Sequence, residues 1–219
     1  MQDDRVLPID RVAVLSFYDD PGPDENGTHA TAINAVVGEE MGLALLIHCL
    51  HRRGVEAQIL NAPCTTGQRR GHRLDGWVIT PGVLYQVEVK NWSAHSLGGR
   101  RFPIGASETD SRRHRRMVWS EYWNGSTFTD SPAAKVIEPM RSPLKGIPVE
   151  PLIVFWVSLH PEGKPEPLFQ VPLLDKAFDR VHIFSMSSYL RSLDDDTVDL
   201  PLPKATARLA ILRRLFGLA

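Results

Sequence analysis

The chain has 219 residues, of which 42% are hydrophobic and 23% charged, an ordinary balance that excludes global disorder. The net charge of −1 excludes a generally basic surface, so a nucleic-acid partner would have to be held by local patches. Two cysteines are too few for a disulfide framework or a thiolate-rich zinc site. Together with an acidic N-terminus and no long apolar run, they predict a cytoplasmic protein with no signal peptide and no membrane partner.

The N-terminal part of the chain reads as a strand followed by a long helix. Arg11–Phe17 is apolar and predicts a first strand, and Tyr18–Gly27 is a turn-rich loop. Thr28 is suited to the N-cap of a helix that runs to Arg53. Gly54 then fits the C′ position, which commonly ends a helix.

Three β-prone segments follow this helix: Glu56–Leu60, Leu74–Thr80 and Val83–Lys90. A polar, basic loop at Thr65–Arg73 separates the first two. The turn signal Pro81-Gly82 joins the second and third segments, which are therefore predicted to form a hairpin.

The pattern weakens after Trp92 and strengthens again near the C-terminus. Asn124-Gly125 predicts an inserted hairpin, and the apolar run Leu152–Ser158 predicts a central strand covered on both faces. The remaining predicted elements are a short helix at Pro132–Met140, a strand at Val181–Phe184, and helices at Ser187–Leu193 and Lys204–Leu218. This order predicts an α/β fold in one domain over residues 1–219, with a mixed sheet flanked by helices and with C-terminal helices.

The hairpin carries an arrangement of charged residues that predicts a metal site. Residues two apart on a strand face the same side, so Glu88 and Lys90 project together. Asp75 on the neighbouring strand can approach Glu88, and two close carboxylates repel unless a cation lies between them. Mg²⁺ prefers carboxylate oxygens as ligands, and the backbone carbonyl of Val89 could supply one more oxygen ligand. Lys90 would then orient or deprotonate the attacking water.

An acid on the long helix is the fourth candidate. Helical steps from Glu39 lead to Leu43, Leu46 and Leu50, a stripe expected to face the core. Glu40 aligns with a flanking stripe instead. Glu39 is therefore chosen as the acid that faces the site, and Glu40 is the alternative.

The order Glu39, Asp75 and Glu88-x-Lys90 resembles the PD-(D/E)XK nuclease superfamily. The segments L-D-G-W-V-I-T and Y-Q-V-E-V-K-N-W are more narrowly similar to its nuclease-related (NERD-like) and Holliday-junction-resolvase-like branches. The resemblance covers residues 36–92, where the core motifs lie. It departs from the family pattern at Leu74, which stands where the family name has a proline.

The resemblance implies a restriction-endonuclease-like fold and Mg²⁺-dependent hydrolysis of phosphodiester bonds, with Mn²⁺ as a substitute. Asp75 and Glu88 would bind the metal, Lys90 would be the catalytic lysine and Glu39 the helix acid. The expected activity is that of a DNA endonuclease, acting as a homodimer or with a partner subunit. The alternatives are an RNA nuclease, or a non-catalytic or partner-activated nucleic-acid-binding subunit. No glycine-rich phosphate loop or nucleophile elbow supports a small-molecule enzyme.

Two arginine-rich segments are candidates for phosphate contacts, which supply most of the affinity for a nucleic acid. Each is equally well explained as a solvated charge run. Their arginines are Arg69, Arg70 and Arg73 before the Asp75 strand, and Arg112, Arg113, Arg115 and Arg116 further along.

Overall fold

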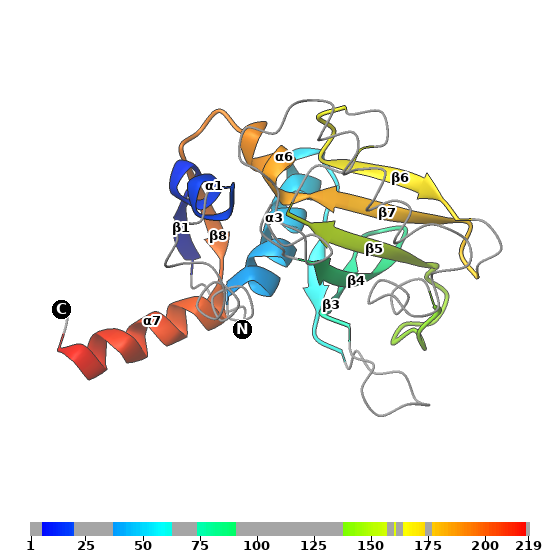
Figure 1. Cartoon of the computed structure of the whole chain (residues 1–219). Helices are drawn as coiled ribbons and strands as arrows, with labels where there is room; N and C mark the ends of the chain where they lie inside the picture. The colour runs from blue at the N-terminus through cyan, green and yellow to red at the C-terminus, as the bar shows by residue number, and fades with distance from the viewer. Residues whose placement is uncertain are drawn as a thin grey trace.

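A computed structural model describes residues 6–19, 37–62, 74–90, 138–156, 160, 164–173 and 177–217. Within these ranges the chain is an α/β protein with four helices, a six-strand mixed sheet and a two-strand sheet (Figure 1). The helices are α1 (Arg11–Asp19), α3 (Glu39–Arg52), α6 (Met186–Arg191) and α7 (Pro203–Phe216). The strands are β1 (Val6–Asp10), β2 (Gln58–Leu60), β3 (Gly76–Ile79), β4 (Leu84–Lys90), β5 (Val149–Phe155), β6 (Leu168–Pro172), β7 (Arg180–Ser185) and β8 (Thr197–Pro201).

The large sheet has the strand order β2-β3-β4-β5-β7-β6. Strands β2, β3 and β4 form an antiparallel meander, β4, β5 and β7 are parallel, and β6 returns antiparallel to β7. The predicted hairpin is confirmed as β3 and β4. Its turn is closed by Thr80, whose N–H donates to the carbonyl of Val83 at 2.9 Å.

Strand β5 confirms the prediction of a central strand covered on both faces. It lies between β4 and β7, and its residues from Leu152 to Phe155 are fully buried. Their side chains alternate between two cores, with Leu152 and Val154 in one and Ile153 and Phe155 in the other. A near-continuous apolar run is what such a strand requires.

The two faces of the sheet differ in what covers them among the described residues. Helices α3 and α6 pack on the face that carries Val87 and Val89 of β4. The opposite face carries Leu84 of β4, together with Ile153 and Phe155 of β5. Because side chains alternate along a strand, Gln86 and Glu88 belong to this second face. Glu88 of the Glu88-x-Lys90 motif therefore lies on the face of the sheet away from α3.

Helix α3 confirms the described part of the predicted long helix. Leu43, Leu46 and Leu50 are buried, so the predicted core stripe is confirmed. The helix ends at Arg52, and Gly54 has a φ of 74°, the left-handed conformation that a C′ glycine adopts at little cost. The start predicted at Thr28 lies outside the described residues.

The predicted first strand at Arg11–Phe17 is wrong, because this segment forms helix α1. The strand precedes it, at β1. Asp10 marks the change from strand to helix, since its Oδ1 accepts from Ala13 N at 2.9 Å and so satisfies an N–H of the first helical turn.

A helix was also predicted at Pro132–Met140. Its last three residues, 138–140, are described by the structure and are not helical. Gln86 Oε1 instead accepts from Met140 N at 3.2 Å.

The C-terminal predictions are confirmed with small changes of boundary, since α6 and α7 occur where helices were predicted and β7 where a strand was predicted. Strand β8 was not predicted. It pairs antiparallel with β1 in a separate two-strand sheet. The hairpin predicted around Asn124 lies outside the described residues. Across the ranges that the structure describes, no helix has the length and apolar character needed to cross a membrane.

Candidate active site

Asp75 lies directly beside β4. The register of β3 and β4 pairs Gly76 with Val87, and Asp75 N donates to Val87 O at 3.1 Å. Asp75 directly precedes β3 and so lies beside the part of β4 that carries Glu88.

The side chain of Asp75 is also bound to β4. Its Oδ2 accepts from Val89 N at 2.6 Å, a short charge-assisted hydrogen bond. On β3, Gly76 faces α3, because a Cβ added there would lie 3.2 Å from Leu43 Cδ1. Asp75 precedes the first residue of β3, and its bonds to Val87 and Val89 hold it against β4 on either side of Glu88.

The surroundings of this pair are apolar on the β5 side. Glu88 is only 4% exposed, and its neighbour in the β4–β5 register is the fully buried Ile153. Asp75 is half-buried. Burial of a carboxylate is unfavourable unless a hydrogen bond or a cation compensates the charge, and like charges in a low-dielectric site repel strongly.

The donor set fits a hard divalent cation. Asp75 and Glu88 supply carboxylate oxygens from adjacent strands, and oxygen ligands are what Mg²⁺ prefers. No cluster of three or more His, Cys, Asp or Glu residues with metal-binding geometry occurs in the described part of the chain.

No family model, no curated protein and no solved structure matches the chain. The assignment of function therefore rests on Asp75, Glu88 and the residues around them.

Lys90 is the last residue of β4, two positions beyond Glu88 and paired with Phe155 in the register. The structure describes its backbone position but not its side chain. The arginines predicted to contact phosphates lie outside the described residues: Arg69, Arg70, Arg73, Arg112, Arg113, Arg115 and Arg116. Their proximity to Asp75 and Glu88 stays a prediction.

The structure assigns different surroundings to the two helix acids. Glu39 is the first residue of α3 and is exposed. Glu40 is partly buried and binds the N-terminus of α7, because its two carboxylate oxygens accept from Lys204 N at 2.7 Å and from Ala205 N at 2.9 Å. A carboxylate at a helix N-terminus satisfies orphan N–H groups and interacts favourably with the helix dipole. Glu40 thus has a structural role. Helix α3 packs on the face of the sheet opposite Glu88, and the role of Glu39 as the helix acid of the site stays a prediction.

This difference predicts that substitutions of Glu40 and Glu39 affect the stability of the protein differently. Glu40→Ala should lower the free energy of unfolding by about 1 kcal/mol, because two N–H groups of α7 lose their acceptor. Glu39→Ala should leave stability within about 0.5 kcal/mol, as expected for an exposed residue. Urea denaturation and exchange of the Lys204 and Ala205 amides would measure the first effect. Equal stability losses in the two variants would contradict these roles.

Sequence reasoning missed the role of Gln86, which is fully buried two residues before Glu88. Its Nε2 donates to Glu138 O at 2.9 Å, and its Oε1 accepts from Met140 N at 3.2 Å. The side chain therefore fixes the segment before β5 against the second face of the sheet. An amide at an otherwise apolar strand position was the available signal.

A second buried polar group occupies the α3 face of the sheet. Glu150 accepts from Arg180 Nη2 at 2.8 Å and is also bonded to His182 Nε2. Burial lowers the pKa of His182, while the hydrogen bonds from Arg180 and His182 outweigh burial and lower the pKa of Glu150. A neutral His182 therefore donates to an ionised Glu150. Tyr85 packs edge-on against His182, with 4.9 Å between ring centroids.

The lowered pKa of His182 predicts that the protein loses stability on acidification. Because its folded pKa lies below the ordinary 6.5, the unfolded chain binds a proton at a higher pH than the folded chain does. Stability should therefore fall as the pH drops below 6.5. Urea denaturation of wild type and His182→Gln at pH 7.5 and 5.5 would test this, since glutamine can still donate to Glu150 but does not titrate. An equal pH dependence in the two proteins would contradict the prediction.

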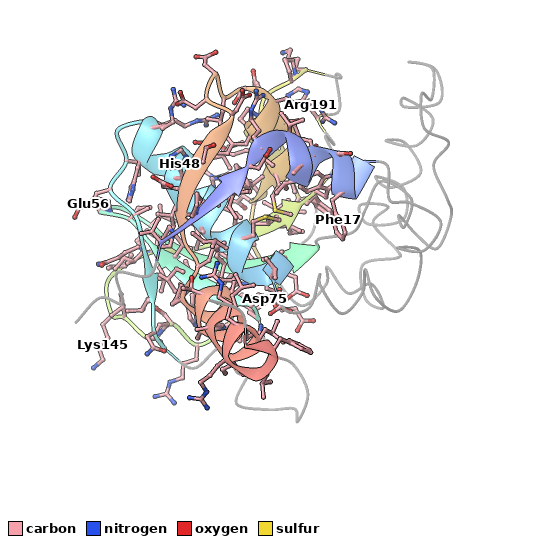
Figure 2. All side chains as sticks on the ribbon, turned by 90° about the vertical axis from the view of Figure 1, so that its left-hand side faces the viewer. Phe17, His48, Glu56, Asp75, Lys145 and Arg191 are labelled. Carbon is pink, nitrogen blue, oxygen red and sulfur yellow. The ribbon has the colours of Figure 1, made fainter. Side chains whose placement is uncertain are left out.

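His48 and Tyr189 form a third polar contact, between α3 and α6. His48 Nδ1 lies 2.6 Å from the Tyr189 hydroxyl. Burial lowers the pKa of His48 and raises the pKa of Tyr189 to about 12, so the hydroxyl donates to a neutral imidazole. Figure 2 shows His48 well apart from Asp75. The pair therefore joins two helices and is separate from the candidate active site.

Proposed function

We propose that the protein is a metal-dependent nuclease of the PD-(D/E)XK class that hydrolyses phosphodiester bonds, with DNA as its expected substrate. The observation that carries this proposal is the position of Asp75 beside β4, where its N–H and its carboxylate bind the residues on either side of Glu88, two residues before Lys90. A six-strand mixed sheet with helices α3 and α6 on one face supports the restriction-endonuclease-like fold that the resemblance implies.

Each residue has a role that follows from its position. Asp75 and Glu88 would hold Mg²⁺ or Mn²⁺, and the Val89 N–H keeps one oxygen of Asp75 in place against β4. When bound, the cation would neutralise charge on the phosphate and lower the pKa of a water ligand. Lys90 would orient that water and offset the negative charge of the transition state. Glu39 lies at the start of α3, which covers the opposite face of the sheet, so the proposed chemistry is carried by Asp75, Glu88 and Lys90.

The strand positions of Asp75 and Glu88 favour this chemistry over a purely structural role. An ion pair such as that of Glu150 with Arg180 balances a buried carboxylate with a cation from the protein itself. Asp75 and Glu88 bring two acids close together on neighbouring segments, and a divalent cation bound by both would offset their repulsion.

The test is cleavage of supercoiled plasmid, linear duplex, single-stranded DNA and RNA, each with Mg²⁺, Mn²⁺ or EDTA. We expect cleavage with either metal, none in EDTA, and none in Asp75→Ala or Lys90→Ala proteins that retain the wild-type circular dichroism spectrum. Activity confined to RNA would change the substrate. Retained activity in Lys90→Ala would remove the mechanism proposed for this residue. Binding without cleavage by the wild type would favour a partner-activated or non-catalytic subunit.

A further inference from the structure

Helix α7 leaves the body of the protein and is exposed for most of its length (Figure 1). Its first turn is anchored, with Ala205 buried and the backbone bound by Glu40. From Arg208 to Phe216 every residue is exposed. Most helical stability in proteins comes from packing, so a helix whose last two turns are exposed is only marginally stable in water.

The exposed part of α7 combines a large apolar surface with positive charge. Leu215 is 72% and Phe216 73% exposed, and three further apolar side chains are also largely exposed: Leu209, Ile211 and Leu212. The helix carries Lys204, Arg208, Arg213 and Arg214 and no acidic residue. Its surface would therefore complement a shallow apolar surface bordered by carboxylates.

Such a surface occurs on the same chain, on the outer face of the β1–β8 sheet. Burial alternates along both strands, with Ile9, Val198 and Leu200 facing the core. The exposed outward positions combine apolar and acidic residues, namely Val6, Pro8, Asp10, Thr197, Asp199 and Pro201. The loop before β8 adds the exposed acids Asp194 and Asp195, whereas the neighbouring Asp196 is ion-paired with Arg11 at 2.8 Å.

The dimensions of the two surfaces match. A helical segment of nine residues is roughly 13 Å long, and strands of five residues are roughly 17 Å long. The exposed segment of α7 can therefore lie along the β1–β8 ribbon. Beyond its first turn it extends away from the ribbon of its own chain (Figure 1), which leaves the ribbon of a second molecule as the surface that it could contact.

We propose that the protein forms a two-fold homodimer in which α7 of each chain docks on the outer face of the partner's β1–β8 sheet. Leu212, Leu215 and Phe216 would supply the apolar contact, and Arg213 and Arg214 would meet the acidic positions around Asp199. Reciprocal exchange of the same two surfaces closes the assembly, as in an isologous dimer. The inference does not depend on the proposed nuclease activity.

The experiment is sedimentation equilibrium of the full chain and of two charge-reversed proteins, all at 0.15 M salt. One protein carries Arg213→Glu and Arg214→Glu, and the other carries Asp195→Lys and Asp199→Lys. Wild type should have twice the mass of one chain. Each variant alone should dimerise with a dissociation constant raised on the order of tenfold or more, because like charges then face each other in both contacts.

A mixture of the two variants tests whether α7 of one chain docks on the β1–β8 sheet of the other. In the mixed dimer, one contact pairs native with native charges and the other pairs reversed with reversed, so a heterodimer should form with nearly wild-type affinity. The replaced side chains are exposed, and circular dichroism should show unchanged folding. A heterodimer no tighter than either variant alone would overturn the docking surface.

Other binding partners of α7 would give different results in these experiments. A dimer that survives Asp195→Lys and Asp199→Lys but dissociates with Leu212→Glu and Leu215→Glu would show α7 packing on α7, and would overturn the proposal. A monomeric wild type would also overturn it. If that monomer bound vesicles of anionic phospholipid through α7, the exposed helix would instead belong at a membrane surface.

Discussion

Glu88→Gln should reduce metal-dependent cleavage by on the order of 10³-fold while leaving the fold intact. Several kcal/mol of transition-state stabilisation depend on a correctly held metal ion, and each 1.36 kcal/mol corresponds to a factor of ten in rate. Glutamine has nearly the same shape as glutamate, so it keeps the packing against Ile153 but removes the charge that would bind the cation. Rates of plasmid cleavage at saturating Mg²⁺ would measure the loss.

Glu150→Gln is a matched control for this substitution. Glu150 is a half-buried carboxylate on the central sheet, but it lies on the α3 face and is bonded to Arg180 and His182. Its replacement should cost about 1 kcal/mol of stability through weakened hydrogen bonds and leave cleavage unchanged. Equal activity in wild type and Glu88→Gln would reject the metal-binding role of Glu88.

A second readout separates loss of metal binding from a general fault in the protein. A ligand that binds only the folded chain raises the midpoint of thermal unfolding. Mg²⁺ should therefore raise the melting temperature of wild type and of Glu150→Gln relative to EDTA. The melting temperature of Glu88→Gln should not respond to Mg²⁺. A response of equal size in all three proteins would place the bound Mg²⁺ elsewhere.

Gly42→Leu should lower the free energy of unfolding by about 1–3 kcal/mol or more, which is the usual penalty for overpacking a core. Gly42 lies where α3 crosses the sheet, and a Cβ there would be 3.1 Å from Val89 Cγ1 and 3.3 Å from Val154 Cγ1. Leucine cannot fit without moving the helix or the strands. Because Val89 N holds the Asp75 side chain, the displacement should impair cleavage as well.

Gly82→Leu is the control for this prediction. Gly82 lies in the turn between β3 and β4, where a Cβ would meet no atom within 4 Å. The same increase in size there should change stability by less than about 0.5 kcal/mol. Urea denaturation of both variants would test the difference. Similar midpoints for the two would show that α3 has more room over Val89 than the structure indicates.

The parts of the fold that follow from local patterns could be predicted from the sequence. The β3–β4 hairpin has alternating side chains and a Pro-Gly turn, and β5 is a buried apolar run between polar segments. In each case the signal is complete within a few residues. The same locality brought Asp75 against the β4 segment that carries Glu88, since a hairpin register follows from its turn.

Other features could not be predicted because they depend on residues far apart in the sequence. Strand β1 pairs with β8 at the other end of the chain, and Arg11–Phe17 then continues as a helix although its apolar run also suits a strand. Similarly, Glu39 and Glu40 were separated in the sequence only by their alignment with apolar stripes. The contact that distinguishes them comes from the Lys204 and Ala205 amides of α7.

Alkylation of the free thiol of Cys49 can measure how often α3 detaches from the sheet. Cys49 is only 1% exposed, and burial raises its pKa, so it carries little of the reactive thiolate in the folded protein. It can be alkylated only in molecules whose helix has lifted from the sheet. The rate of its modification, followed by mass spectrometry of the peptide that contains it, therefore reports how often that opening occurs without denaturant.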